Sequence, residues 1–188
     1  MKSLTKIFVA LLLTVGITFG GFNSNAHAQS SPLAIPNISV DVNTTFDKIV
    51  NGVRFDRKYT VVVANKTGKT LERVGVYNDS SNWPLGDIDA NTAVGQQFDG
   101  IPRTNSFSFA SNYRVQPGKN VQLVAKFPVI GTRKVGLGSF NEDGNKPAER
   151  IWDQTGDSSD KAISNDPFQA RASIKQKDGS LVWYYEIK

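Results

Sequence analysis

Hydrophobic side chains recur at every second position through most of the chain, and this period of two is the spacing of β-strands rather than of helices. Residues 121–129 show it most clearly, with apolar residues at alternate positions and polar residues such as Gln122 between them. Residues 181–187 alternate in the same way after a turn at Asp178-Gly179, which predicts that Trp183 points into a core. The sequence therefore predicts an all-β fold: an antiparallel β-sandwich of about eight strands with two long loops and no helix.

Three local patterns refine this prediction. Asn51-Gly52 suits the positive φ angles of a type I′ turn and predicts a hairpin around it. Residues 59–64 form a β-branched run, which predicts a strand buried on both faces. Gly136 and Gly138 share one face of a later strand, which predicts either a sharp bend or another backbone lying close to it.

The first residues have the organisation of a secretory signal. A basic start precedes an uncharged run from Ile7 to Phe19, and Ala26-His27-Ala28 supplies small residues at a cleavage site. The sequence therefore predicts a cleaved signal peptide at 1–28, a disordered leader at 29–36 and one β-sandwich domain at 37–188. We expect the protein to be secreted or periplasmic.

The residue types that catalysis and metal binding use most are missing from the predicted domain. His27, inside the predicted signal, is the only histidine, and the chain has no cysteine. Their absence removes the commonest general base, the thiol nucleophile and the usual zinc and copper ligands. Charge is nearly balanced, because 17 acidic residues offset most of the 22 basic ones. We therefore predict no enzymatic activity, no cofactor and no nucleic-acid partner.

Two long stretches lack sustained alternation and are rich in Gly, Asp, Asn, Ser and Pro. They are residues 79–104 and 141–168, and each holds one tryptophan, Trp83 and Trp152. Disordered segments are poor in aromatic residues, so a tryptophan in each stretch indicates that both are ordered. Ordered loops of this length are often functional, which makes them the candidate binding region.

A glycan or another cell-surface molecule is the ligand that these stretches favour. Exposed indole rings such as Trp83 and Trp152 can stack on sugar rings, while Asp87, Arg150 and Asp153 can bind hydroxyl groups. This combination resembles the binding surfaces of β-sandwich carbohydrate-binding modules. The competing interpretation is that both indoles fold inward and fix their loops to the core.

Calcium is the one metal whose oxygen ligands the chain offers in sequence. Asp87, Asp89 and Asn91 alternate as in the start of a calcium loop, but Thr92 and Phe98 stand where such a loop needs Gly and Glu. We therefore predict a solvated turn and no metal site.

Hydrolysis by two carboxylates is an alternative that needs no histidine. Glu72 and Glu186 lie on predicted strands and point away from the predicted cores, where a glycosidase pair could form. Strand glutamates are more often solvated, so we rank a non-catalytic binding module above this alternative.

A membrane-docking or pore-forming, toxin-like β-sandwich is a further alternative. Aromatic residues at Tyr113 and 183–185, with the basic residues Lys126, Arg133 and Lys134, are the types that dock at a bilayer surface. A structural or subunit-contact domain is the third possibility. The sequence leaves the ligand and the oligomeric state open.

Overall fold

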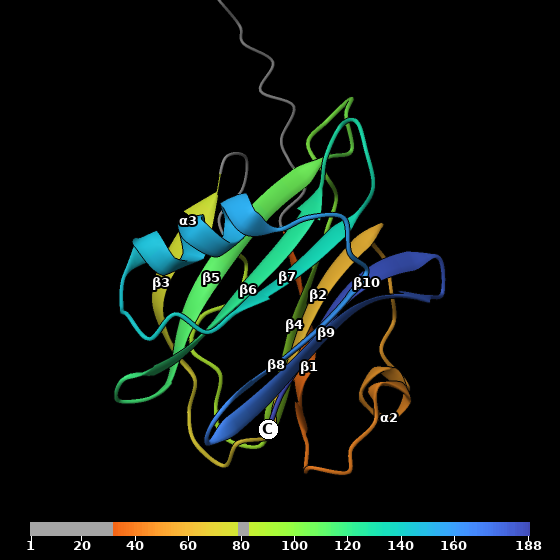
Figure 1. Ribbon diagram of the computed structural model, residues 1–188. Coiled ribbons are helices and arrows are strands. Elements are labelled where there is room, and N and C mark those ends of the chain that lie inside the picture. The colour runs from red at the N-terminus through yellow and green to blue at the C-terminus, as the bar shows by residue number, and fades with distance from the viewer. Residues whose placement is uncertain (1–31, 79–82) are drawn as a thin grey trace, which may run out of the picture.

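The computed structural model describes residues 32–78 and 83–188. The predicted signal peptide and the first residues of the predicted leader lie outside the described residues. Ten described strands form two sheets packed face to face, which confirms the all-β sandwich, and a helix lies on the outer face of each sheet (Figure 1). The elements are β1 (Leu33–Ser39), α2 (Phe46–Val50), β2 (Tyr59–Asn65), β3 (Glu72–Asn78), β4 (Thr92–Phe98), β5 (Phe107–Gln116), β6 (Lys119–Phe127), β7 (Lys134–Gly138), α3 (Asn145–Gln154), β8 (Asp160–Asn165), β9 (Phe168–Lys177) and β10 (Ser180–Ile187).

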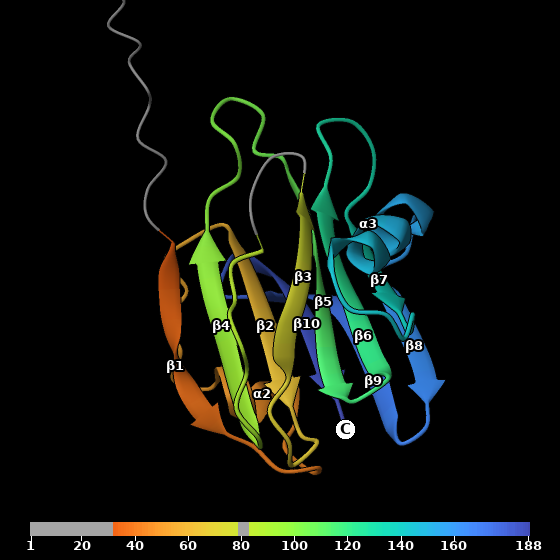
Figure 2. The same ribbon diagram turned by 90° about the vertical axis from the view of Figure 1, so that its left-hand side faces the viewer.

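The larger sheet has six strands in the order β1-β4-β2-β10-β9-β8, and the smaller has four in the order β3-β5-β6-β7. Figure 2 shows the two layers with β1 and β4 at one side of the molecule and α3 at the other. Every strand pair of the described residues is antiparallel except β2 and β10, which run parallel from Leu181 beside Tyr59 to Ile187 beside Asn65. The last strand therefore lies inside the larger sheet, between the early strand β2 and β9, a pairing that alternation alone does not specify.

Aromatic side chains fill the space between the sheets. Trp183 is fully buried, as predicted, and its ring centre lies 4.8 Å from that of Phe107 in an edge-to-face contact. Tyr59 and Phe109 also contact Phe107, at 5.0 and 5.3 Å between ring centres. Aromatic pairs in this geometry add to the stability that burial alone provides.

The outer face of the larger sheet is buried too, because α2 covers it. Ile49 and Val50 of α2 pack with Tyr184 and with the outward-facing residues of β2 in a second apolar cluster. Every residue of β2 is buried as a result, which confirms the strand predicted to be buried on both faces.

The hairpin predicted around Asn51-Gly52 is wrong, because α2 precedes this pair and β2 begins only at Tyr59. The Thr45 hydroxyl caps the helix by accepting a hydrogen bond from the Lys48 amide. Gly52 does adopt a positive φ of 81°, but it ends the helical segment instead of joining two strands. The apolar pair before it was too short to separate a helical turn from a strand.

The predicted disordered leader is also corrected at its end. Leu33 to Pro36 belong to β1, where Ile35 pairs with Gly95 of β4 and is 3% exposed. The register shifts between Ile35 and Ile38, at Pro36. Since proline has no amide donor, it is tolerated in this edge strand at an irregularity.

Both predicted long loops contain regular structure, and the absence of helices was a wrong prediction. Residues 79–104 include β4, and residues 141–168 include α3 and β8. Helix α3 lies on the glycine-lined face of the smaller sheet, where a methyl group on Gly136 would overlap Thr155 and one on Gly138 would crowd Ile151. This confirms that a second segment lies close to those glycines.

Candidate functional site

Trp83 lies between the two sheets and is 2% exposed. Its indole Nε1 donates a hydrogen bond of 2.8 Å to the Tyr113 hydroxyl, and its ring contacts Phe109 and Tyr185 edge to face. The indole therefore fixes its segment to the core and offers no stacking surface to a ligand. The polar residues just before it, Ser80 to Asn82, lie outside the described residues.

Trp152 lies on α3, against the outer face of the smaller sheet, and is only partly buried. Its Nε1 donates to the Ser108 hydroxyl at 2.6 Å, and the Lys126 ammonium lies 3.5 Å from the ring centre. Tyr77 contacts the same ring edge to face at 5.3 Å. The two predicted ligand-binding tryptophans therefore lie on opposite faces of one sheet.

The predicted polar residues are divided in the same way. Asp87 accepts a hydrogen bond of 2.7 Å from the Arg73 amide at the start of β3. Arg150 and Asp153 belong to α3, where the Arg150 guanidinium lies 4.6 Å from the centre of the Phe140 ring. The five predicted site residues do not form one surface, because the core holds Trp83.

All four aromatic residues considered for membrane docking are buried as well. Tyr113, Trp183 and Tyr185 are fully buried, and Tyr184 is 6% exposed. Burial raises the pKa of the Tyr113 and Tyr185 hydroxyl groups above the ordinary value. A docking surface in this protein must therefore use other residues.

The most apolar exposed loop of the described chain follows β6. The strand predicted to reach Val129 ends at Phe127, and the chain leaves the sheet at Pro128. Val129 is 66% exposed and Ile130 is 90% exposed, and both are among the few exposed large hydrophobic residues. We call residues 128–131 the aliphatic tip. Figures 1 and 2 show this loop projecting from the upper end of the sandwich.

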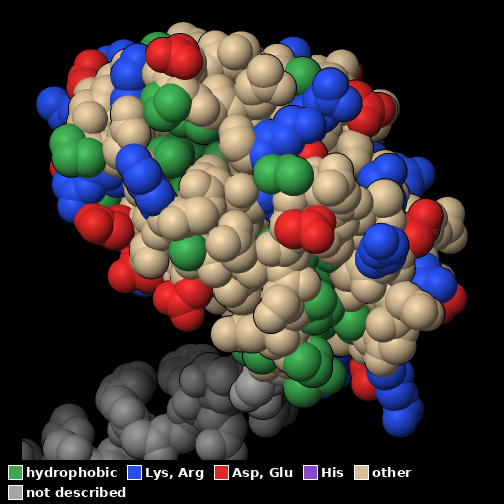
Figure 3. Space-filling model, turned by 90° about the horizontal axis from the view of Figure 1, so that it is seen from below, with side chains coloured by type: hydrophobic (Ala, Val, Ile, Leu, Met, Phe, Trp, Pro, Cys, Tyr) green, Lys and Arg blue, Asp and Glu red, His purple; other side chains and the backbone are tan. Residues whose placement is uncertain are grey.

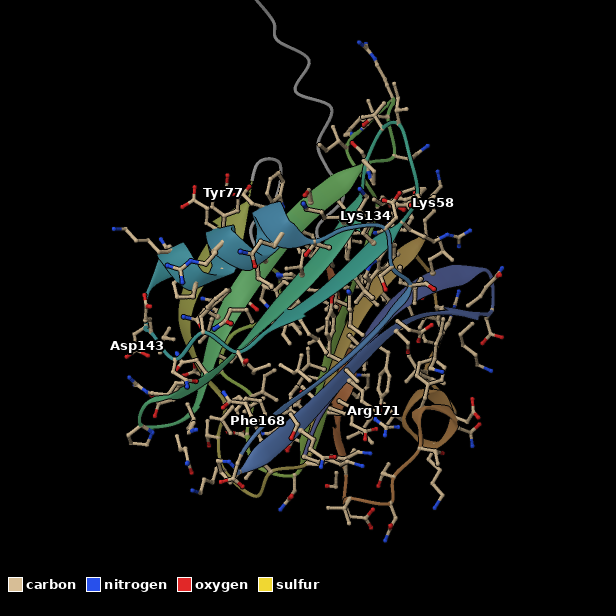
Figure 4. The ribbon with its side chains drawn as sticks, viewed as in Figure 1. Lys58, Tyr77, Lys134, Asp143, Phe168 and Arg171 are labelled. Atoms are coloured by element: carbon tan, nitrogen blue, oxygen red, sulfur yellow. The ribbon has the colours of Figure 1, made fainter. Side chains whose placement is uncertain are left out.

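Basic residues follow the aliphatic tip and occur in a second loop at the same end of the sandwich. Arg133 follows it, and Arg103 lies in the neighbouring loop between β4 and β5; both are exposed, and neither pairs with a carboxylate of the described residues. Lys134 forms an ion pair of 2.8 Å with Asp157, and hydrogen bonds from Lys134 and Thr132 hold the pKa of that carboxyl below its usual value. Figure 4 shows Lys134 near the base of this loop.

A pocket of about 330 Å³ opens beneath the tip. Ile101, Phe127 and Val129 form its apolar wall, and Lys126 and Trp152 line the side next to α3. We call it the tip pocket. Of the five predicted site residues, only Trp152 lines the tip pocket. An apolar chain or ring fits this lining chemically.

Neither a metal-binding cluster nor the glutamate pair considered for hydrolysis is brought together among the described residues. No three His, Cys, Asp or Glu residues among them are placed to hold a metal ion. Glu72 pairs with Arg114 on the smaller sheet, whereas Glu186 pairs with Lys66 at 2.9 Å on the larger one. The carboxylate pair considered for hydrolysis is therefore split between two sheets. Neither described helix has the length and apolar character needed to cross a bilayer.

The fold and the tip define a two-sheet β-sandwich with one helix on each outer face and an exposed aliphatic loop at one end. No model of a known protein family and no curated protein matches the sequence. The fold is similar to the crystal structure of the lipid-binding protein Nakanori, with a TM-score of 0.55 and 9% identity over 75% of each chain. At this identity the likeness establishes the fold alone.

Proposed function

We propose that this protein is a non-catalytic binding module that docks on a lipid membrane through the aliphatic tip. The observation that carries the proposal is the exposure of Val129 and Ile130 side by side at the end of a projecting loop. Arg133, three residues after Ile130, adds a charge that no described carboxylate neutralises, and Arg103 in the loop between β4 and β5 is likewise without an ion pair to a described carboxylate. Apolar residues that enter a bilayer and cations that meet its headgroups are the two components of peripheral docking.

The magnitudes favour reversible docking over insertion. Full removal of a Val or Ile side chain from water contributes about 1.5–3 kcal/mol. Each Lys or Arg near an anionic membrane contributes about 1 kcal/mol. Contributions of this size from two aliphatic side chains and a nearby arginine suit weak, peripheral binding that depends on the lipid and the salt concentration.

Two further observations support the proposal. The similar fold of Nakanori belongs to a lipid-binding protein. The apolar run at the start of the chain predicts export, which would bring the domain to a secreted or periplasmic location where membranes and cell-surface molecules are accessible.

Cosedimentation with vesicles tests the proposal. The purified protein is mixed with vesicles of phosphatidylcholine alone and with phosphatidylserine added. We expect Val129→Ser/Ile130→Ser to lower the bound fraction, with an affinity loss of at least about tenfold. Val42→Ser is the matched control, because Val42 is 60% exposed but belongs to the segment between β1 and α2, which Figure 1 shows at the opposite end of the sandwich, and it should bind like the unchanged protein. Equal binding by the double variant, or no binding by the unchanged protein, contradicts the proposal.

Glycan recognition remains a prediction, and the same assay includes it. Of the two tryptophans, Trp152 is the one that a ligand can reach, because Trp83 is in the core. Pelleting with insoluble polysaccharide or cell-wall material, abolished by Trp152→Ala and unaffected by Val129→Ser/Ile130→Ser, would favour the glycan over the lipid.

A further inference from the structure

A second groove, of about 630 Å³, lies on the outer face of the larger sheet, at the end opposite the aliphatic tip. The segment leading into α2 forms one wall, and strands β8, β9 and β10 form the other. Figure 3 views the molecule from this end and shows Lys and Arg side chains interspersed with Asp and Glu, with hydrophobic side chains only in small groups. We call it the α2 groove.

Two unpaired cations line the α2 groove. Arg171 and Lys175 are on the outward face of β9 with Ser173 between them, since residues two apart point to the same side of a strand. Both cations are exposed, and no carboxylate in residues 32–78 or 83–188 lies within ion-pairing distance of either. Figure 4 shows Arg171 between β9 and α2.

The base of the groove is a neutralised ion pair. Lys66 has a side chain only 2% exposed, and its ammonium binds the Glu186 carboxylate at 2.9 Å and the Thr44 carbonyl at 2.6 Å. The Tyr184 hydroxyl donates to the same carboxylate at 3.2 Å. The Glu186 carboxylate therefore binds Lys66 and Tyr184 and forms no ion pair with Arg171, although the two residues are paired in the β9–β10 register.

The remaining charge of the groove is positive. Besides the Lys66–Glu186 pair, its lining holds Lys161, Arg171 and Lys175 against the single carboxylate of Asp160. A ligand that complements this lining is an anion. Arginine supplies a planar fork of donors that suits a phosphate group, and the Ser173 hydroxyl adds another donor between the two cations.

An aromatic side chain in the α2 groove indicates a second property of the ligand. Phe46 is partly exposed in the groove and meets Tyr184 edge to face at 5.1 Å between ring centres. The Lys175 ammonium lies 5.2 Å from the centre of the Phe46 ring, so the cation and the apolar surface are adjacent. A ligand with a phosphate group next to a flat or apolar part would contact both.

We propose that the α2 groove binds a small organic phosphate, with Arg171 and Lys175 holding the phosphate and Phe46 contacting the organic part. The volume of the groove lies within the range of small-molecule sites. The groove and the aliphatic tip are at opposite ends, so a protein docked through the tip leaves the groove open to a soluble ligand. The proposal therefore does not depend on membrane binding.

Calorimetric titration with phenyl phosphate tests the proposal, with benzyl alcohol as the uncharged comparison. We expect phenyl phosphate to bind and benzyl alcohol to give no heat. Arg171→Gln/Lys175→Gln should weaken phenyl phosphate binding by about tenfold or more. Lys177→Gln is the matched control, because Lys177 lies on the same face of β9, beside Asp178 and outside the groove, and it should change the affinity less than about twofold.

The organic part is tested separately by Phe46→Leu. This change should weaken phenyl phosphate and leave inorganic phosphate unchanged, because only the former contacts the ring. Absence of phenyl phosphate binding, or equal binding by Arg171→Gln/Lys175→Gln with its thermal unfolding unchanged, overturns the proposal. Vesicle binding by the same double variant separates the two proposals, since it should match that of the unchanged protein if the groove serves a soluble ligand.

Discussion

Trp83 and Trp152 have similar surroundings in sequence and opposite positions in the structure. Each stands alone in a polar, glycine-containing stretch. Trp83 contacts Phe109 on the inward face of β5, and Trp152 binds Ser108, one residue earlier, on the outward face. Because successive residues of a strand point to opposite sides, a difference of one position on β5 separates a core residue from a partly exposed one.

The largest effect is expected for Trp83→Ala. Removal of this indole leaves a cavity between the sheets and takes away the hydrogen bond to Tyr113, so the free energy of unfolding should fall by about 3–5 kcal/mol. Urea unfolding measures it. Trp83→Phe keeps a ring in place and should lose distinctly less; equal stability of the unchanged protein and Trp83→Ala would contradict the core position of this residue.

Gly75→Ala tests how closely the segment before α3 lies on the smaller sheet. A methyl group at Gly75 would overlap the Gly144 carbonyl at the start of α3, so we expect a loss of about 1–3 kcal/mol in the free energy of unfolding. Gly86→Ala is the control, because no described atom lies within 4 Å of the added carbon and its φ is not positive. Similar losses in both variants would show that the contact with Gly144 is unimportant.

Trp152→Ala should cost less than Trp83→Ala, about 1–2 kcal/mol, because its ring is only partly buried and lies outside the main core. Thermal or urea unfolding of the two alanine variants side by side gives the comparison directly. If Trp152→Ala were as damaging as Trp83→Ala, α3 would be part of the main cooperative core and the contrast would fail.

Stability at alkaline pH probes the core around Trp83, because Tyr113 and Tyr185 contact this indole. Burial raises the pKa of Tyr113 and Tyr185 above the 10.0 of an exposed tyrosine. Above pH 10.0 these two hydroxyls therefore bind fewer protons in the unfolded chain than in the folded one, so their contribution to stability is constant below that pH and falls above it. Unfolding followed together with tyrosinate absorbance should show both hydroxyls ionising only as the chain unfolds. Ionisation of the Tyr113 or Tyr185 hydroxyl near pH 10.0 in the folded protein would contradict this.

Alternation predicted the strands that form the core and said nothing about what covers their outer faces. Gln122 reads as a solvent-facing residue of its strand, yet it is fully buried. Its amide donates to Asn112 and to the Phe140 carbonyl, and Asn112 in turn donates to the Glu142 carbonyl. These hydrogen bonds attach the segment before α3 to the sheet. A polar side chain at an outward position has the same sequence signature whether water or another segment satisfies it.

The sequence likewise predicted one part of the candidate site and not the other. The sequence placed Lys126, Arg133 and Lys134 among the basic residues of a docking surface, and the structure puts them around the aliphatic tip and its pocket. It did not indicate the tip itself, because Val129 continues the alternation of the preceding strand. Only the end of pairing after Phe127 turns that residue outward.

The sequence by itself determined the strand character of the chain, the inward position of Trp183 and the turn at Asp178-Gly179, because these depend on period and local backbone preference. The tertiary structure alone decided the parallel pairing of β2 with β10, the burial of Trp83 and the exposure of Ile130. Each of these depends on which distant segment lies against a residue, and a period of two identifies the faces of a strand without specifying what covers them.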